Sequence, residues 1–225
     1  MKKYILIAAA FVVSFTMNAQ FTAGIDGGLS IPSNNYGSSS GSVSSSGGTV
    51  SGYAKIGTCF DGYVGFKFIP IIGVMAQYGM NNNSYDASKL NSNSVTVTTS
   101  GGDKITEYLI GPYLSIKLAN IKIEAKLLGG LVSSNYPTLT ENTNGGNVYS
   151  SVVNSFSTGN AFGYCAGVKI KFMAAKILGI GLGVDYVGSD ESFTGVSNVN
   201  SQTVSNSYKM SVGVFQATLG LSIDL

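Results

Sequence analysis

A long alternation of apolar and polar residues between Ile105 and Val132 constrains the fold more than any other part of this chain. The first half places its apolar side chains on one face: Tyr108, Ile110, Leu114, Ile116 and Leu118. After Ala119 and Asn120 the alternation resumes in the same phase, and a two-residue connection of this kind is typical of a tight hairpin. The stretch therefore predicts two half-buried antiparallel strands.

Each arm of this predicted hairpin is longer than the ~5–6 residues of a usual soluble strand, and matches the ~9–11 residues that a tilted strand needs to cross a bilayer. A slip of one residue would turn Lys122 and Lys126 toward lipid, at a cost of roughly 2–4 kcal/mol each near the midplane. The hairpin therefore predicts membrane-spanning strands in a tightly fixed register.

The first residues have the pattern of an export signal. Lys2 and Lys3 precede an apolar run from Ile5 to Phe15, and Met17-Asn18-Ala19 offers a cleavage site after Ala19. The alternative, an uncleaved helical anchor, needs a longer apolar run. We expect residues 1–19 to be a cleaved signal peptide and residues 20–225 to form a single domain. An exported β-chain with strands of this length points to the outer membrane, because a closed barrel leaves no unpaired backbone in lipid.

The same alternation recurs along the chain and predicts eight strands. Four long polar segments separate them at 33–52, 81–104, 133–159 and 188–206, and short turns lie near Pro70, Asn120 and Ala175. Long and short connections alternate, which is typical of outer-membrane barrels. The predicted fold is all-β: a transmembrane antiparallel up-and-down β-barrel of eight strands, with four long extracellular loops and three short periplasmic turns. Before Phe215 the apolar residues Met210, Val212 and Val214 change parity, which indicates a bulge or an extension above the bilayer.

Aromatic residues on the predicted outward faces sort into two groups by height. One group lies near the long loops: Tyr78, Tyr108, Phe162, Tyr164 and Tyr186. The other lies near the short turns: Phe21, Phe66, Phe68 and Phe172. Two such groups predict the aromatic girdles that mark the interfaces of a membrane barrel.

The predicted inward face carries a cluster of charges. Its members are Lys117, Lys122, Lys126, Lys169, Lys171, Glu107, Glu124, Asp26 and Asp185. The lysines gather toward the short turns, and this arrangement fits two interpretations: a mouth that attracts anions, or a network of ion pairs that fills the lumen. Many glycines share this face, so the interior is either partly hollow or makes room for large side chains such as Tyr63 and Tyr113. Cys59 and Cys165 face each other across the lumen, too far apart for a disulfide, and are expected to be free thiols.

Composition excludes several classes of function. The chain has no His, so the histidine-dependent chemistry of known barrel enzymes is absent, and its inward carboxylates form no catalytic motif. We therefore predict no enzyme, no catalytic residues, no cofactor and no metal site. Without the two leader lysines, eleven lysines balance eleven acidic residues, so no electrostatic surface for nucleic acid is expected.

From Phe21 to Leu225 the chain resembles the small eight-stranded OmpA/OmpX-like outer-membrane barrels, the porin-family proteins, through its architecture and its terminal strand Phe215–Leu225. The resemblance implies outer-membrane lipid and the barrel-insertion machinery as partners, a monomer, and an extracellular ligand for the four long loops. Three functions remain open: a structural or surface-interaction protein, a narrow passive channel, and an accessory subunit of a secretion or assembly machine.

Overall fold

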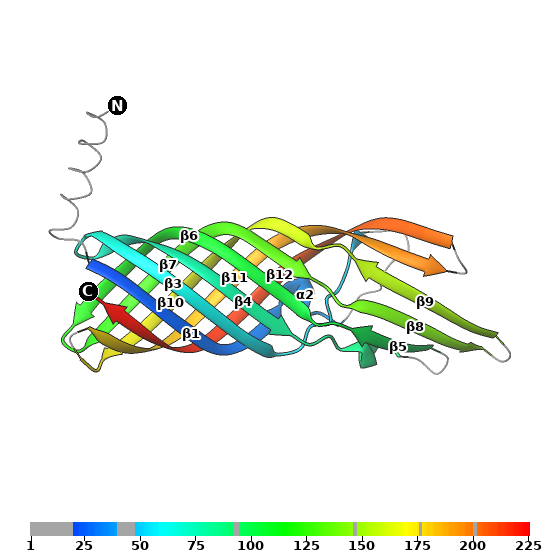
Figure 1. The fold of residues 1–225 in the computed structure, drawn as a ribbon, viewed down its shortest axis with the longest axis horizontal. Coiled ribbons are helices and arrows are strands. Elements are labelled where there is room, and N and C mark those ends of the chain that lie inside the picture. Colours follow the sequence, from blue (N-terminus) through cyan, green and yellow to red (C-terminus); the bar gives the residue numbers. More distant parts are fainter. Residues whose placement is uncertain (1–19, 40–47, 92–94, 146–147, 176, 200–201) are drawn as a thin grey trace, which may run out of the picture.

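The computed structural model describes residues 20–39, 48–91, 95–145, 148–175, 177–199 and 202–225. The predicted signal peptide, residues 1–19, lies outside this range. The described residues form one sheet that curls into a barrel (Figure 1). Its elements are β1 (Gln20–Ser33), α2 (Asn34–Gly37), β2 (Gly48–Thr49), β3 (Gly57–Ile69), β4 (Ile72–Asn83), η1 (Ala87–Leu90), β5 (Val95–Ser100), β6 (Asp103–Leu118), β7 (Ile121–Asn135), β8 (Thr138–Gly145), β9 (Val148–Phe156), β10 (Gly159–Met173), β11 (Leu178–Val199) and β12 (Gln202–Asp224).

The sheet closes on itself through antiparallel pairs. Its order runs β12-β1-β3-β4-β6-β7-β10-β11, and β11 pairs back with β12. The first and last strands meet with Thr22 opposite Asp224. Closure gives every strand of this ring two hydrogen-bonded neighbours, which removes the free edges that an open sheet would expose.

The predicted count of eight strands is not confirmed for the chain as a whole, because the described part contains twelve. The four strands outside the ring, β2, β5, β8 and β9, occupy segments that were expected to be loops, and β11 and β12 run on into the fourth such segment. These segments are polar, so apolar alternation could not reveal them. They are rich in Thr, Val, Ser and Asn. Their strands pair through backbone hydrogen bonds, and Thr and Val favour the extended backbone conformation.

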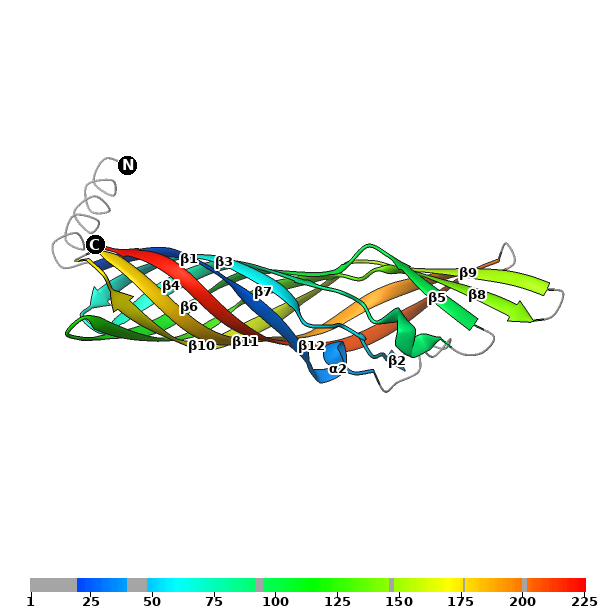
Figure 2. The ribbon, with the colours of Figure 1, turned by 90° about the horizontal axis from the view of Figure 1, so that it is seen from below.

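Short turns join the strands at one end of the barrel, which we call the turn end; the opposite end is the loop end. The predicted turn at Ala119 and Asn120 is present, since β6 stops at Leu118 and β7 starts at Ile121. Ala119 adopts a φ of 53°, in the left-handed region that tight hairpin turns require. Beyond the loop end, β5, β8, β9 and the far halves of β11 and β12 project away from the barrel (Figures 1 and 2).

The polarity of the two faces changes along β12. Near the turn end the outward side chains are apolar and exposed, as at Phe215 and Leu219, while Gln216 and Thr218 are buried inside. Near the loop end, Met210, Val212 and Val214 are buried inside and Lys209 is exposed outside. The register between β11 and β12 is continuous through this change. The parity change in the sequence therefore marks an extension of the strand with an apolar interior, and not a bulge.

A hydrophobic cluster fills the interior near the loop end. Tyr36 from α2 is fully buried there, and packs with inward side chains that include Ile105, Val132, Val187 and Val212. The interior therefore has two layers, a polar one toward the turn end and an apolar one toward the loop end. In the described residues no helix is long and apolar enough to span a membrane.

Candidate functional site

The lysines of the predicted lumen cluster are paired with carboxylates inside the barrel. Lys126 Nζ lies 2.9 Å from Asp185 Oδ2, and Lys169 forms an ion pair with Asp26. Lys122 Nζ lies 2.6 Å from Asp224 Oδ1 and 3.3 Å from Glu124 Oε1. Lys171 Nζ lies 2.9 Å from Glu124 Oε2. Four inward lysines and four inward carboxylates are therefore ion-paired in three groups: two separate pairs, and a cluster of Lys122 and Lys171 with Glu124 and Asp224. Ion pairs inside the lumen are what the second interpretation of this cluster describes.

Lys117 is placed differently from the other four. It is opposite Lys122 in the β6–β7 register, as expected, but its side chain is exposed at the turn end. Among the described residues no carboxylate lies within ion-pair distance of it. Lys117 thus contributes charge to the mouth of the barrel and none to the buried network.

Two carboxylates lie closer to the loop end without a lysine partner. Glu107 accepts hydrogen bonds from Asn81 Nδ2 at 2.5 Å and from Gln216 Nε2 at 3.2 Å. Asp61 is reached by Gln77 Nε2 at 3.5 Å. Carboxylates without a lysine partner therefore lie toward the loop end, whereas the carboxylates near the turn end, Glu124 and Asp224, are paired with lysines.

Side chains fill the space that the inward glycines leave. A Cβ on Gly65 would lie 2.8 Å from Thr22 and 3.2 Å from the Tyr113 ring, and one on Gly181 would lie 3.2 Å from both Lys169 and Lys171. A cavity between Met75, Tyr113 and Lys126 measures about 10 Å³. This is near the smallest space that holds one water molecule. In this part of the barrel the glycines make room for tyrosines and lysines, and do not open a passage.

The aromatic residues assigned to the two girdles all lie on the outer face. Tyr78 pairs with Tyr108 between β4 and β6, and their ring centroids are 5.1 Å apart. Tyr186 contacts Tyr164 and Phe215. At the turn end Phe21 is opposite Phe66, and Phe68 and Phe172 are exposed. Phe162, opposite Leu131 toward the loop end, is also exposed. These aromatic residues therefore share the outer face with the exposed aliphatic side chains.

Both cysteines are free thiols, as the sequence predicted, and both are buried inside the barrel. Cys59 Sγ donates to the Leu29 carbonyl oxygen at 3.5 Å. No group of three or more His, Cys, Asp or Glu residues within the described ranges could hold a metal ion.

A polar cluster lies among the apolar residues of the loop end. Glu191 Oε1 accepts hydrogen bonds from Ser134 at 2.7 Å and Ser189 at 3.1 Å. Asp103 is 1% exposed, and neither of its carboxylate oxygens has a hydrogen-bond partner. Burial raises the pKa of Asp103 to about 8 and also raises the pKa of Glu191. The proton on Asp103 is thus retained near neutral pH.

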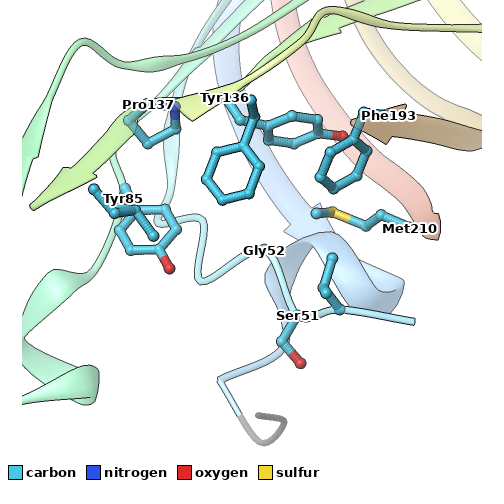
Figure 3. A pocket seen from close by; sticks show the side chains of 10 residues that line it. Ser51, Gly52, Tyr85, Tyr136, Pro137, Phe193 and Met210 are labelled. Carbon is cyan, nitrogen blue, oxygen red and sulfur yellow. The ribbon is translucent and has the colours of Figure 1, made fainter. Parts of the chain in front are cut away.

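An apolar pocket lies between the barrel and the projecting strands. Figure 3 shows Tyr85, Tyr136, Phe193 and Met210 around it, with Ser51 from another segment. The Tyr136 and Phe193 ring centroids are 4.7 Å apart. The free volume is about 30 Å³, the space of one small group. Sequence reasoning missed this pocket because it treated the polar segments as loops. The available signal was the isolated aromatic residues of these segments: Tyr85, Tyr136, Phe156 and Phe193.

Comparisons with known proteins concern the fold. No family model matches the chain, and no curated protein matches it significantly. Among solved structures, the chain is similar to Neisserial surface protein A (TM-score 0.49, 12% identity, 90% of this chain and 96% of that one). It is also similar to the attachment invasion locus protein Ail of Yersinia pestis (TM-score 0.47, 13% identity, 92% of this chain and 99% of that one). A third similar structure is the outer membrane protease OmpT of Escherichia coli (TM-score 0.49, 9% identity, 92% of this chain and 96% of that one).

Proposed function

We propose that this chain is an eight-stranded barrel of the outer membrane, with its turn end in the periplasm and its loop end outside the cell. The outer face supports this placement, because it exposes many large apolar side chains, with aromatic residues toward both ends. The inner face of the same strands is polar and ion-paired, which is the alternation that a lipid-facing barrel needs. The closed ring needs no second chain to cover an edge, so we expect a monomer.

We further propose that the protein acts by surface interaction and has no enzymatic activity. The observation that carries this proposal is the folded sheet beyond the loop end, where β8 pairs with both β5 and β9, and β9 pairs with β11. Unstructured, fully hydrated polar loops would not form such pairs of strands. The aromatic pocket at its base offers a rigid apolar contact for a side chain of a partner protein, and aromatic residues of this kind often dominate binding surfaces.

A channel is the competing function, and the interior argues against it. Four of the inward lysines are used in ion pairs, and Tyr36 and its apolar neighbours fill the interior of the loop-end half. Single-channel recording of the refolded protein in a planar bilayer tests this directly, with folding verified by heat-dependent gel mobility. We expect no discrete conductance steps. Steps with an anion preference that falls in Lys126→Glu would instead establish a pore.

The surface role is tested on intact cells. The β8–β9 hairpin, residues 138–156, is replaced by a short Gly-Ser turn, which leaves every strand of the barrel ring intact. We expect cells with this variant to lose adhesion to protein-coated surfaces, while the amount of folded barrel in the outer membrane stays unchanged. Equal adhesion of both cell types would contradict the surface role.

A further inference from the structure

The turn-end mouth contains a cavity of about 400 Å³ that the ion-pair network does not fill. Lys67, Lys117 and Lys122 line it, together with Ser115 and Asp224. Asp224 is already neutralised, since its Oδ1 lies 2.6 Å from Lys122 Nζ and 3.9 Å from Lys171 Nζ. The side chains of the cavity therefore carry an excess of positive charge.

Within the part of the chain that the structure describes, two side chains of this cavity lack a partner: the Lys67 ammonium group has no carboxylate within ion-pair distance, and the Ser115 hydroxyl has no hydrogen-bond partner. Lys67 is only 5% exposed, and no carboxylate of the described residues lies within ion-pair distance of it. A buried ammonium group without a counter-charge is strongly unfavourable, so this position favours an anion. Ser115 is 2% exposed, and its hydroxyl has no hydrogen-bond partner. Buried polar groups are rarely left unpaired, so this hydroxyl also indicates a missing ligand atom.

The rim of the same cavity is apolar. Phe21, Ile71 and Leu225 line it and are exposed on the outer face. In the proposed orientation this rim continues the lipid-facing surface at the level of the periplasmic headgroups. The cavity thus combines two ammonium groups and a hydroxyl with an apolar border.

We propose that the turn-end mouth is a binding site for a phosphate group, held by Lys67, Lys117 and Ser115. A phosphate offers several charged oxygens, each able to accept a hydrogen bond from an ammonium group or a hydroxyl. The group belongs either to a phospholipid headgroup, whose acyl chains lie along the apolar rim, or to a free phosphate in the periplasm. The site lies at the opposite end of the barrel from the proposed interaction surface and does not depend on it.

The test uses the refolded protein in uncharged detergent micelles, with binding measured by calorimetry and native mass spectrometry. The probes are phosphatidylglycerol, diacylglycerol, which has the same chains without phosphate, and inorganic phosphate. We expect saturable binding of a phosphate probe and no such binding of diacylglycerol. Binding of phosphatidylglycerol alone identifies a headgroup site, and binding of inorganic phosphate that also displaces the lipid identifies a site for the free anion.

Two variants connect this binding to the cavity. Lys67→Gln with Lys117→Gln should weaken phosphate binding by about tenfold or more, because it removes two charge-assisted hydrogen bonds to the phosphate. The matched control, Lys104→Gln with Lys209→Gln, removes two exposed lysines near the loop end and should leave binding unchanged. Ser115→Ala keeps every charge, and should weaken binding even if the lysine variant folds poorly. The proposal is overturned if no phosphate probe binds saturably, or if both site variants bind like the unmodified protein.

Discussion

Lys126 Nζ lies 2.9 Å from Asp185 Oδ2 and 2.6 Å from Gln77 Oε1, so one side chain links β7 to β11 and β4 across the barrel interior. β7 pairs with neither of these strands. The contact therefore ties together parts of the wall that the backbone hydrogen bonds do not join directly.

Lys126→Met should destabilise the barrel by about 3–5 kcal/mol, because it leaves Asp185 as a buried carboxylate without its counter-charge. The double variant Lys126→Met with Asp185→Asn should recover part of the loss. Urea unfolding in micelles, followed by circular dichroism, measures both. A single variant as stable as the unmodified protein would show that water already screens this pair.

Gly28→Ala should impair folding, because its Cβ would collide with the Ala217 carbonyl oxygen and lie 2.8 Å from the Thr218 Cα, both in the backbone of β12. Overpacking of this kind typically costs about 1–3 kcal/mol. Gly62→Ala is the matched control, because its Cβ would meet no atom within 4 Å. The two variants are compared by the fraction of protein that shows heat-dependent gel mobility after refolding. Equal fractions for Gly28→Ala and Gly62→Ala would refute the predicted clash between β1 and β12.

Stability should fall as pH rises if Asp103 titrates as its surroundings indicate. Its pKa is about 8 in the folded protein and 3.8 ordinarily, so the folded state binds more protons across that window. The contribution of Asp103 to the free energy of unfolding is thus greatest below pH 4, and it is lost as the pH rises through about 8. Asp103→Asn removes this titration and should flatten the dependence of the urea midpoint on pH between 5 and 9. If the urea midpoint changes with pH in the same way in the Asp103→Asn variant and the unmodified protein, groups other than Asp103 cause the pH dependence.

Phe193→Ala should loosen the projecting strands and leave the barrel intact. Phe193 is buried, and its ring contacts Tyr136, Phe156 and Tyr208. Removing a buried phenylalanine ring costs about 3–5 kcal/mol. Limited proteolysis should cut the variant near β8 and β9 faster, with unchanged heat-dependent mobility of the barrel. Val204→Ala, at an exposed position, is the control; similar cleavage of both variants would argue against a packed aromatic cluster.

The two thiols should be unreactive while the barrel is folded, since Cys59 and Cys165 are both buried inside it. A maleimide carrying a polyethylene glycol chain should add to neither cysteine in micelles and to both after boiling in detergent. Each added chain slows migration in a gel, so the gel shows how many cysteines have reacted. Rapid labelling of the folded protein would reveal water-filled access to the interior, which would favour the channel.

Part of this structure could be predicted from local patterns. Apolar alternation identified the hairpin through Ala119 and Asn120, the outward position of Tyr108 and Leu114, and the inward position of Lys122, because side chains alternate with a period of two along any strand. It could not identify β8 and β9, because their composition is polar. Nor could it show that Met210 and Val212 are buried inside the part of the barrel near the loop end.

The sequence by itself determined which residues share a face and where the short turns lie, since both depend on neighbours along the chain. Only the tertiary structure decided that Lys126 pairs with Asp185, that Tyr36 is buried in the loop-end interior, and that Lys67 has no carboxylate of the described residues within ion-pair distance. These relationships join residues far apart in sequence, and they exist only once closure of the sheet sets which side chains meet across the interior.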